Sequence, residues 1–86
     1  MSMSEAQQRL LGVLPELKDR LREQDYQEAV EETQAGEEGL ALELICAQLH
    51  EFGIRIPRST YLKLQAIGAG MGMRAETWQV LEGLID

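Results

Sequence analysis

Apolar residues recur at helical spacing along most of the chain. Near the N-terminus this stripe consists of Leu10, Leu14, Leu17 and Leu21, widened by Leu11 and Val13. Such spacing is typical of an amphipathic helix with one buried face. Pro15 interrupts the pattern, and because the leucine phase continues across it, we predict one kinked helix rather than two. Ser4 followed by Gln7 resembles a capping box at its start.

Three further helices are predicted over residues 25–34, 40–52 and 58–69. Gly36 and Gly53 are expected to end the first two, and the glycines between positions 68 and 72 to break the third. The helix over 40–52 is apolar around more than half of its circumference, so we predict that it forms the centre of a bundle. Its apolar positions are Ala41, Leu42, Ile45, Cys46, Leu49 and Phe52.

The C-terminal part predicts a connector and one more helix. Residues 54–57 precede or include Pro57 and are expected to be extended, but their alternation is too short for a strand. A last helix over 75–85 is expected to bury Trp78, Leu81 and either Leu84 or Ile85. The pattern as a whole predicts an all-α fold, a compact bundle of about five short helices in a single domain spanning residues 1–86.

Acidic residues are concentrated in the middle of the chain. Residues 23–54, here called the acidic window, contain nine carboxylates and no lysine or arginine, while the remainder contains six acids and eight bases. The formal net charge of −7 therefore originates in the window. Such a field attracts a cationic partner and repels nucleic acid and anionic membranes. The acids are Glu23, Asp25, Glu28, Glu31, Glu32, Glu37, Glu38, Glu43 and Glu51.

A charged helix face is often merely solvated. In the window, however, no base is available at i+4 to compensate the acids, and clustered like charges cost folding stability. Glu37 and Glu38 suit the positive end of the helix that follows them. The acids of the preceding helix, from Asp25 to Glu32, have no such structural role, which favours a role in binding.

Leu40 and Leu44 leave two interpretations open. On a helical wheel both lie beside the stripe that contains Glu43 and Glu51, away from the main apolar face. Either the helix over 25–34 covers the two leucines, or they are apolar anchors inside an acidic rim.

Residues with catalytic or ligand chemistry are scarce. Glu43, Cys46 and His50 share one helix and could begin a zinc site, but no second cysteine or histidine completes it. We interpret them as a core thiol near a surface imidazole. The glycines between 68 and 72 follow a helix and have no lysine beside them, unlike a phosphate-binding loop. We therefore expect no enzyme activity, no cofactor and no metal.

The basic residues and the N-terminal sequence bear on the cellular location of the protein and on the kinds of partner it binds. Arg55, Arg58, Lys63 and Arg74 could form a small basic patch, but the net field opposes a polyanion, so these bases are expected to balance acids across the bundle. Apolar runs are only a few residues long, and residues 1–5 show no secretion signal. A single cysteine fits a reducing cytoplasm, and neither nucleic acid nor a membrane is an expected partner.

Several segments carry a family resemblance. They are 25–29 (Asp-Tyr-Gln-Glu-Ala), 35–49, 54–57 (Ile-Arg-Ile-Pro), 61–64, 71–73 and the region of Trp78 and Leu81, with 36–43 (Gly-Glu-x-Gly-Leu-Ala-Leu-Glu) the most recognisable. Together they resemble the small all-helical immunity proteins of bacterial polymorphic toxin systems. These are the MafI family and related immunity proteins of contact-dependent growth inhibition. The resemblance covers residues 20–85.

This resemblance implies a bacterial cytoplasmic binding protein. Such proteins block the toxic C-terminal domain of a cognate effector, often a nuclease and here expected to be a ribonuclease, in a one-to-one heterodimer. It does not identify the toxin and transfers no catalytic residue. Residues such as Gly36, Leu42 and Trp78 would mainly maintain the fold.

The charge pattern and the resemblance lead to one predicted mechanism. A nuclease needs a basic groove for phosphates, and a carboxylate-rich surface can occlude that groove. Lasting inhibition also needs apolar or aromatic anchors. An alternative is an acidic adaptor or regulatory domain that binds a basic protein segment or self-associates. The predicted partner-binding residues are Asp25, Tyr26, Glu28, Glu31, Glu32, Glu37, Glu38, Leu40, Glu43, Leu44 and His50.

Overall fold

Five α-helices and a short 3-10 helix account for the regular structure of residues 2–86, the part of the chain that the computed structural model describes. The predicted all-α bundle of about five helices is confirmed. The elements are α1 (Glu5–Leu17), α2 (Glu23–Gln34), α3 (Glu38–Glu51), α4 (Arg58–Gly70), α5 (Glu76–Gln79) and the 3-10 helix (Glu82–Leu84).

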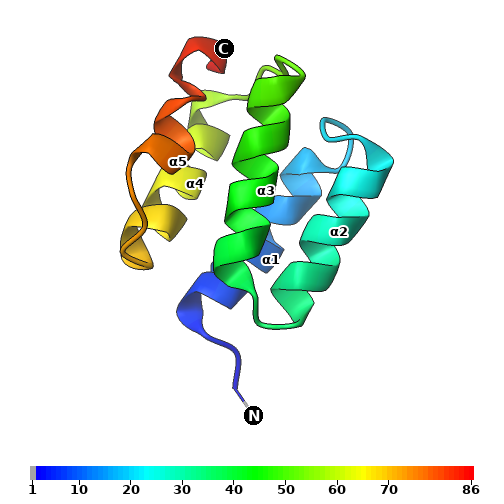
Figure 1. The fold of residues 1–86 in the computed structure, drawn as a ribbon, viewed down its shortest axis with the longest axis vertical. Coiled ribbons are helices and arrows are strands. Elements are labelled where there is room, and N and C mark those ends of the chain that lie inside the picture. The colour runs from blue at the N-terminus through cyan, green and yellow to red at the C-terminus, as the bar shows by residue number, and fades with distance from the viewer. Residues whose placement is uncertain (1) are drawn as a thin grey trace.

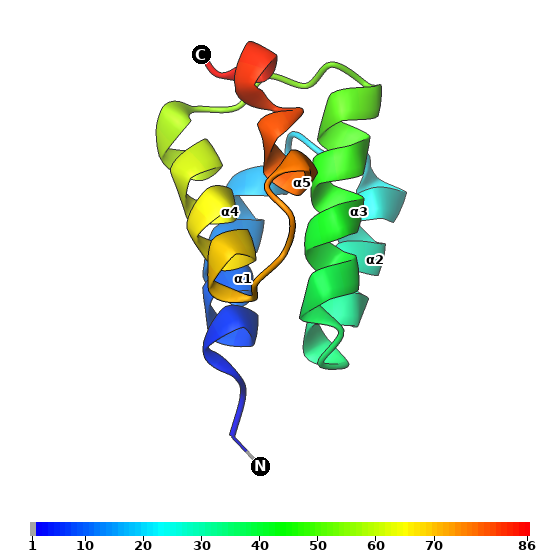
Figure 2. The same ribbon diagram turned by 60° about the vertical axis from the view of Figure 1, so that its left-hand side comes forward.

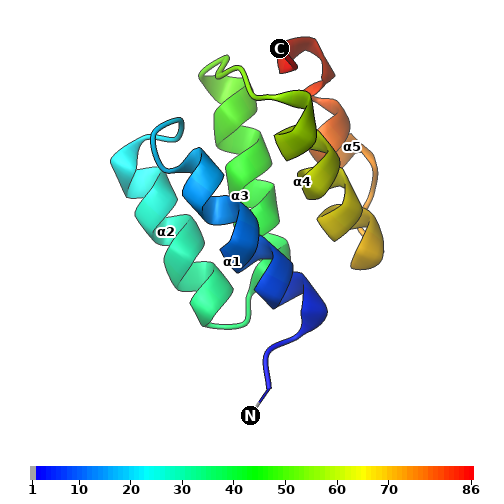
Figure 3. The same ribbon diagram turned by 180° about the vertical axis from the view of Figure 1, so that it is seen from behind.

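The helices are arranged around α3. Figure 1 shows α2 on one side of α3 and α4 with α5 on the other, while α1 lies behind. The reverse view places α1 and α4 nearest the viewer (Figure 3). Helix α2 packs against α3 and α1, and α1 also packs against α4 (Figure 2). One side of α3 is therefore covered by the bundle and the opposite side is free of other helices.

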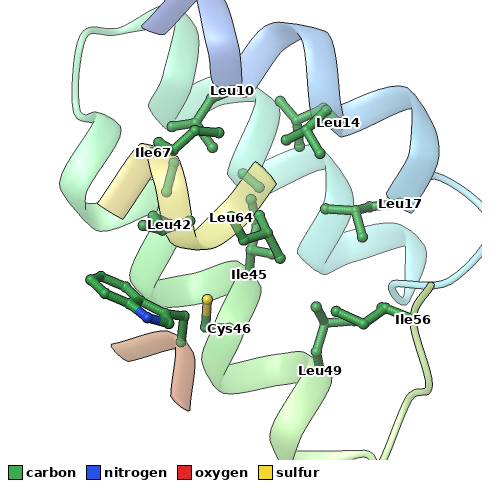
Figure 4. Packing of buried hydrophobic residues seen from close by; sticks show 14 of the residues in the cluster. Leu10, Leu14, Leu17, Leu42, Ile45, Cys46, Leu49, Ile56, Leu64 and Ile67 are labelled. Carbon is green, nitrogen blue, oxygen red and sulfur yellow. The ribbon is translucent and has the colours of Figure 1, made fainter. Parts of the chain in front are cut away.

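The core is built from the predicted leucine and isoleucine positions. Side chains of α1, α3 and α4 converge in the interior (Figure 4). They include Leu10, Leu14, Leu17, Leu42, Ile45, Leu49 and Leu64, all at most 2% exposed. Five residues of α3 are buried, which agrees with its expected central position.

The prediction of one long first helix is wrong at its C-terminal end. Helix α1 contains Pro15 but ends at Leu17, and a turn leads to α2, which begins at Glu23 rather than at residue 25. Leu21 is nevertheless buried, with its backbone N–H donating to the carbonyl oxygen of Leu17. Leu21 fits the leucine spacing although it lies after the helix, because the turn directs its side chain into the same core.

Both ends of α3 depart from the prediction. The helix begins at Glu38 and ends at Glu51, so Phe52 lies just outside it. Phe52 is 47% exposed and not part of the core, and the Arg22 guanidinium lies 4.2 Å from the centre of its ring. This cation–π contact covers one side of the phenyl ring at the start of α2.

Helix α4 continues through Gly68, which was expected to break it. Gly68 is buried inside the helix, and the chain turns only after Gly70, where Gly72 has a φ of +71°. A Cβ on Gly68 would overlap the Trp78 ring, so the glycine permits close packing of α5 against α4. Met71 and Met73, which follow the helix, are half-buried against the core.

The predicted helix over 75–85 is replaced by two short elements. Only Glu76–Gln79 is α-helical, and Ile85 pairs with Ile56 of the connector in an isolated parallel bridge. The Ile56 N–H donates to the carbonyl oxygen of Leu84, and the Asp86 N–H donates to that of Ile56. The last residues therefore form hydrogen bonds with the connector instead of continuing the helix. The local sequence pattern could not predict this pairing with a distant segment.

Candidate partner-binding surface

Most ion pairs among residues 2–86 join a base to an acid outside the acidic window. Four of the five ion pairs among residues 2–86 have this form: Arg9–Glu5, Lys63–Glu16, Arg74–Glu76 and Arg55–Asp86. The expectation that these bases balance acids across the bundle is confirmed for Arg55 and Lys63. Arg74 instead pairs with Glu76, two residues away, and Arg58 forms no ion pair within the described residues. The window consequently keeps a largely uncompensated negative charge.

Asp25 is the window acid that does have a basic partner. Its buried carboxylate accepts hydrogen bonds from Arg22 Nε at 2.9 Å and from Gln48 Nε2 of α3 at 3.1 Å. The Arg22 hydrogen bond holds the pKa of Asp25 below its ordinary value, and the Gln48 hydrogen bond acts in the same direction. The prediction that Asp25 has no structural role is therefore wrong, because it connects α2 to α3.

Three window carboxylates form a cluster where α2 leads into α3. Glu32 Oε1 is buried and has no hydrogen-bond partner among residues 2–86. Burial raises the pKa of the Glu32 carboxyl, and the negative charges of Glu28 and Glu37 raise it further. Glu28, Glu37 and the adjacent Glu31 are exposed. This part of the surface therefore combines a strong negative field with one poorly solvated carboxylate.

The structure separates the two leucines that the helical wheel places together. Leu44 is half-buried against the core, in line with coverage by neighbouring elements, whereas Leu40 is 52% exposed in the first turn of α3. Leu40 lies three residues after Glu37, close to the carboxylate cluster along the chain. Leu40 thus matches the description of an apolar anchor beside acids, and Leu44 does so only in part.

Glu43 and His50 lie on a different part of α3, in a shallow hollow shared with α5. The hollow has a volume of about 420 Å³. Its other lining residues are Ala47, Glu51, Glu76, Thr77 and Val80. The contribution of α5 could not be predicted from the sequence, because only the packing of α5 on α3 brings these residues together. The one sequence signal for this hollow is Val80, an apolar residue near the C-terminus that lies outside the predicted core positions. In the structure its side chain is 42% exposed.

Tyr26 and Glu38 are not part of these two regions. Tyr26 is half-buried and lines a separate hollow with Lys18, Asp19 and Leu21. It is two residues from Glu28, and such positions point in different directions on a helix. Glu38 accepts a hydrogen bond from Ser4 Oγ at 2.9 Å, which ties the start of α3 to the N-terminus of α1.

The histidine and cysteine of α3 do not converge on a metal-binding geometry. Cys46 is buried, and burial raises the pKa of its thiol to about 12, while His50 is exposed. No group of three potential metal-ligating side chains occurs between positions 2 and 86. Within the same residues, no helix combines the length and the apolar character needed to cross a bilayer.

Comparisons with protein-family models, with characterised proteins and with solved structures gave no match. Function must therefore be inferred from the chemistry of the surface. The acids with neither a base nor a structural hydrogen bond among residues 2–86 all lie in the acidic window except Asp19. They are Asp19, Glu23, Glu28, Glu31, Glu32, Glu37, Glu43 and Glu51.

Proposed function

We propose that this protein is an immunity protein that binds and neutralises the toxic domain of a cognate polymorphic toxin. The observation that carries the proposal is the uncompensated acidic surface of α2 and α3. Four of the five ion pairs among residues 2–86 use acids outside the window, although salt bridges within the window would have stabilised the fold. A protein that keeps such a field gains a strong attraction to a basic partner.

The proposed inhibitory mechanism is occlusion of a phosphate-binding groove. A nuclease holds its substrate with clustered Lys and Arg side chains. Glu28, Glu31 and Glu37 are exposed and can face such a cluster, in place of the nucleic-acid backbone. Opposite fields also raise association rates from about 10⁶ M⁻¹s⁻¹ towards 10⁸ M⁻¹s⁻¹ or higher. Rapid capture protects the cell before the toxin cuts its substrate.

The complex is proposed to be a one-to-one heterodimer that forms in the bacterial cytoplasm. Inhibition by occlusion requires no catalytic group, cofactor or metal on the immunity protein. The toxin is most simply a ribonuclease, in keeping with the sequence resemblance to immunity proteins of contact-dependent growth inhibition. Leu40 is the best-placed apolar anchor for the contact, because it is exposed next to the carboxylate cluster.

The test begins with co-purification from the native host. The tagged protein is purified, bound proteins are identified by mass spectrometry, and the toxin-like domain among them is expressed alone in a heterologous bacterium. The proposal expects that this domain is basic, that it stops growth, and that co-expression of the present protein restores growth. Growth arrest that persists despite full co-expression contradicts the proposal.

A pair of matched variants tests the surface. Glu28→Lys/Glu31→Lys reverses two exposed window acids, while Glu5→Lys/Asp19→Lys makes the same change of charge outside the window. Glu32 is left intact because its carboxylate is partly buried. At low salt the first variant is expected to associate with the toxin domain at least about tenfold more slowly and to lose protection. Equal association rates for the two variants would exclude the acidic contact.

The alternative function, an acidic adaptor or regulatory domain, is favoured by one observation. Leu40 and Val80 are exposed beside acids, as in a site that binds a basic segment of any protein. An adaptor would bind such a segment without rescuing poisoned cells. A self-associating version would be dimeric by light scattering, whereas the immunity protein is expected to be monomeric before it meets its toxin.

A further inference from the structure

Within residues 2–86, the side of α3 that faces away from the core carries a row of exposed and half-buried apolar side chains. Leu40 and Ala47 are both exposed and lie seven residues apart, which places them on one face of the helix. Half-buried Leu44 lies between them, and Val80, directly after α5, lines the hollow described above together with Ala47. Leu40, Leu44, Ala47 and Val80 are here called the α3 stripe.

Acids border the α3 stripe on the α5 side and at the start of α3. On the α5 side, the hollow is lined by Glu43, Glu51 and Glu76 together with Ala47 and Val80. At the start of α3, Glu37 precedes Leu40 and is close enough to Glu28 and Glu32 to affect the protonation of Glu32. Of these six acids only Glu76 has a basic partner within residues 2–86. The face therefore has an apolar centre and negative edges.

We propose that the α3 stripe binds a cationic amphipathic helix of the partner protein. Its apolar side would pack on Leu40, Ala47 and Val80, and Lys or Arg side chains on both of its flanks would reach the bordering carboxylates. The distance along α3 from Leu40 to Glu51 corresponds to roughly 16 Å, about three helical turns of the partner. This inference rests on the proposed function in that it names the structural element of the toxin domain that the surface recognises.

Charge and backbone geometry favour this occupant over others. A second copy of the chain, related by twofold symmetry, would place the same acidic borders against each other, which is repulsive. An extended peptide would need a sheet edge, whereas the regular structure of residues 2–86 is helical apart from one isolated bridge. A proline-rich segment needs an aromatic-lined groove, and the α3 stripe has no aromatic member.

Synthetic peptides provide a probe that does not require the toxin. The first is a designed, capped helix of about three to four turns, with leucines at three- and four-residue spacing and lysine or arginine on both flanks. The second has the same composition in an order that removes the amphipathic pattern. Binding is followed by fluorescence anisotropy in low salt, and the contact is mapped by ¹⁵N NMR shifts. The amphipathic peptide is expected to bind at least about tenfold more tightly and to shift Leu40, Ala47 and Val80.

Two matched pairs of variants test the location. Leu40→Ala is compared with Leu62→Ala, since Leu62 is 47% exposed on α4 and Leu40 is 52% exposed on α3. Ala47→Arg places a bulky, positively charged side chain on the face, where it would obstruct and repel the cationic peptide. It is compared with Ala69→Arg at an exposed alanine of α4. The α3 variants are expected to weaken peptide binding about five- to tenfold, and the α4 variants to leave it unchanged. Circular dichroism spectra of all four variants serve as the check that each is folded.

The outcomes distinguish this inference from the proposed function. Equal affinity for the amphipathic peptide and the peptide without the amphipathic pattern overturns the inference, as do NMR shifts confined to α1 and α4. In either case the acidic contact with a toxin can still hold through Glu28 and Glu31. Amphipathic binding that is lost in Ala47→Arg supports the inference, even if no toxin is neutralised and the proposed function fails. Ala47→Arg that binds the peptide as well as Ala69→Arg contradicts the inference directly.

Discussion

Two glycines in helix interiors have opposite structural roles. Gly68 of α4 is buried, and a Cβ there would overlap the Trp78 ring and lie 3.0 Å from Leu42 Cδ2. Gly12 of α1 is exposed, and a Cβ there would meet nothing within 4 Å. Glycine is therefore required by packing at position 68 and is only a cost in conformational entropy at position 12.

Gly68→Ala is expected to lower the free energy of unfolding by about 1–3 kcal/mol, because the added methyl group overpacks the contact between α4 and Trp78. Gly12→Ala, its matched control, is expected to raise the free energy by about 0.5–1 kcal/mol. Urea denaturation followed by circular dichroism measures both. A neutral Gly68→Ala would show that Trp78 does not pack on α4 as described.

At the scale of elements, the contact between α2 and α3 determines which acids remain available to a partner. Asp25 contributes its carboxylate to Arg22 and Gln48 and so stabilises the contact. Glu32, on the same helix, contributes a buried oxygen without a donor among residues 2–86. Helix α2 therefore contains one carboxylate that favours the folded state and one that opposes it.

Asp25→Ala is expected to destabilise the protein by about 1–3 kcal/mol at pH 7, since Gln48 loses its acceptor and Arg22 its partner. The folded pKa of Asp25 lies below its ordinary value of 3.8, so its stabilising effect is present above that value and is lost as the pH falls through the folded pKa. Urea unfolding at neutral and strongly acidic pH should show this loss. Glu28→Ala, at an exposed site, is the control and should change stability by less than about 0.5 kcal/mol.

Glu32→Gln is expected to raise the free energy of unfolding by about 1 kcal/mol at pH 7, because it removes a poorly solvated charge near Glu28 and Glu37. The folded pKa of Glu32 lies above its ordinary value of 4.5, so ionised Glu32 destabilises the fold above the folded pKa. That penalty disappears as the pH falls below 4.5, and the two proteins should then be equally stable. A stabilising effect that is independent of pH would argue against a charge-based origin.

At the scale of the whole molecule, charge is distributed unequally around the bundle. The groove between α1 and α4 is lined by Arg9 and Lys63, whose charges are matched by Glu5 and Glu16. On the α2 and α3 side, most acids of the window face solvent. The one base that pairs with a window acid among residues 2–86 is Arg22, which binds the buried Asp25. The net charge of −7 thus becomes a one-sided field in the folded protein.

Screening of this field by salt should stabilise the fold. Raising NaCl from about 0.01 M to about 1 M shortens the Debye length from roughly 30 Å to roughly 3 Å and weakens repulsion between the window acids. The free energy of unfolding in urea, an uncharged denaturant, is expected to rise. The gain should be smaller in Glu28→Gln/Glu31→Gln, which has fewer repelling acids. A stability that falls with salt would indicate that the remaining ion pairs dominate.

The sequence alone determined the class of fold and most of the core. Period-3.6 spacing of Leu10, Leu14, Leu42, Ile45 and Leu49 reflects burial on one helix face, and a local pattern suffices to detect it. The same holds for Gly36 and Gly53, whose φ values of +81° and +59° suit residues that end helices. The concentration of acids in residues 23–54 is likewise a property of the sequence, because it depends only on the order of residues along the chain.

Only the tertiary structure decided which residues are available to a partner. Asp25 and Glu28 look equivalent in sequence, yet one is held by a side chain from another helix and the other is exposed. Val80 and Ala47 line the same hollow, and Ile85 pairs with Ile56, across distances in sequence that no helical period spans. The physical reason is that burial and hydrogen bonding depend on every element that reaches a position, whereas periodicity reports one helix at a time.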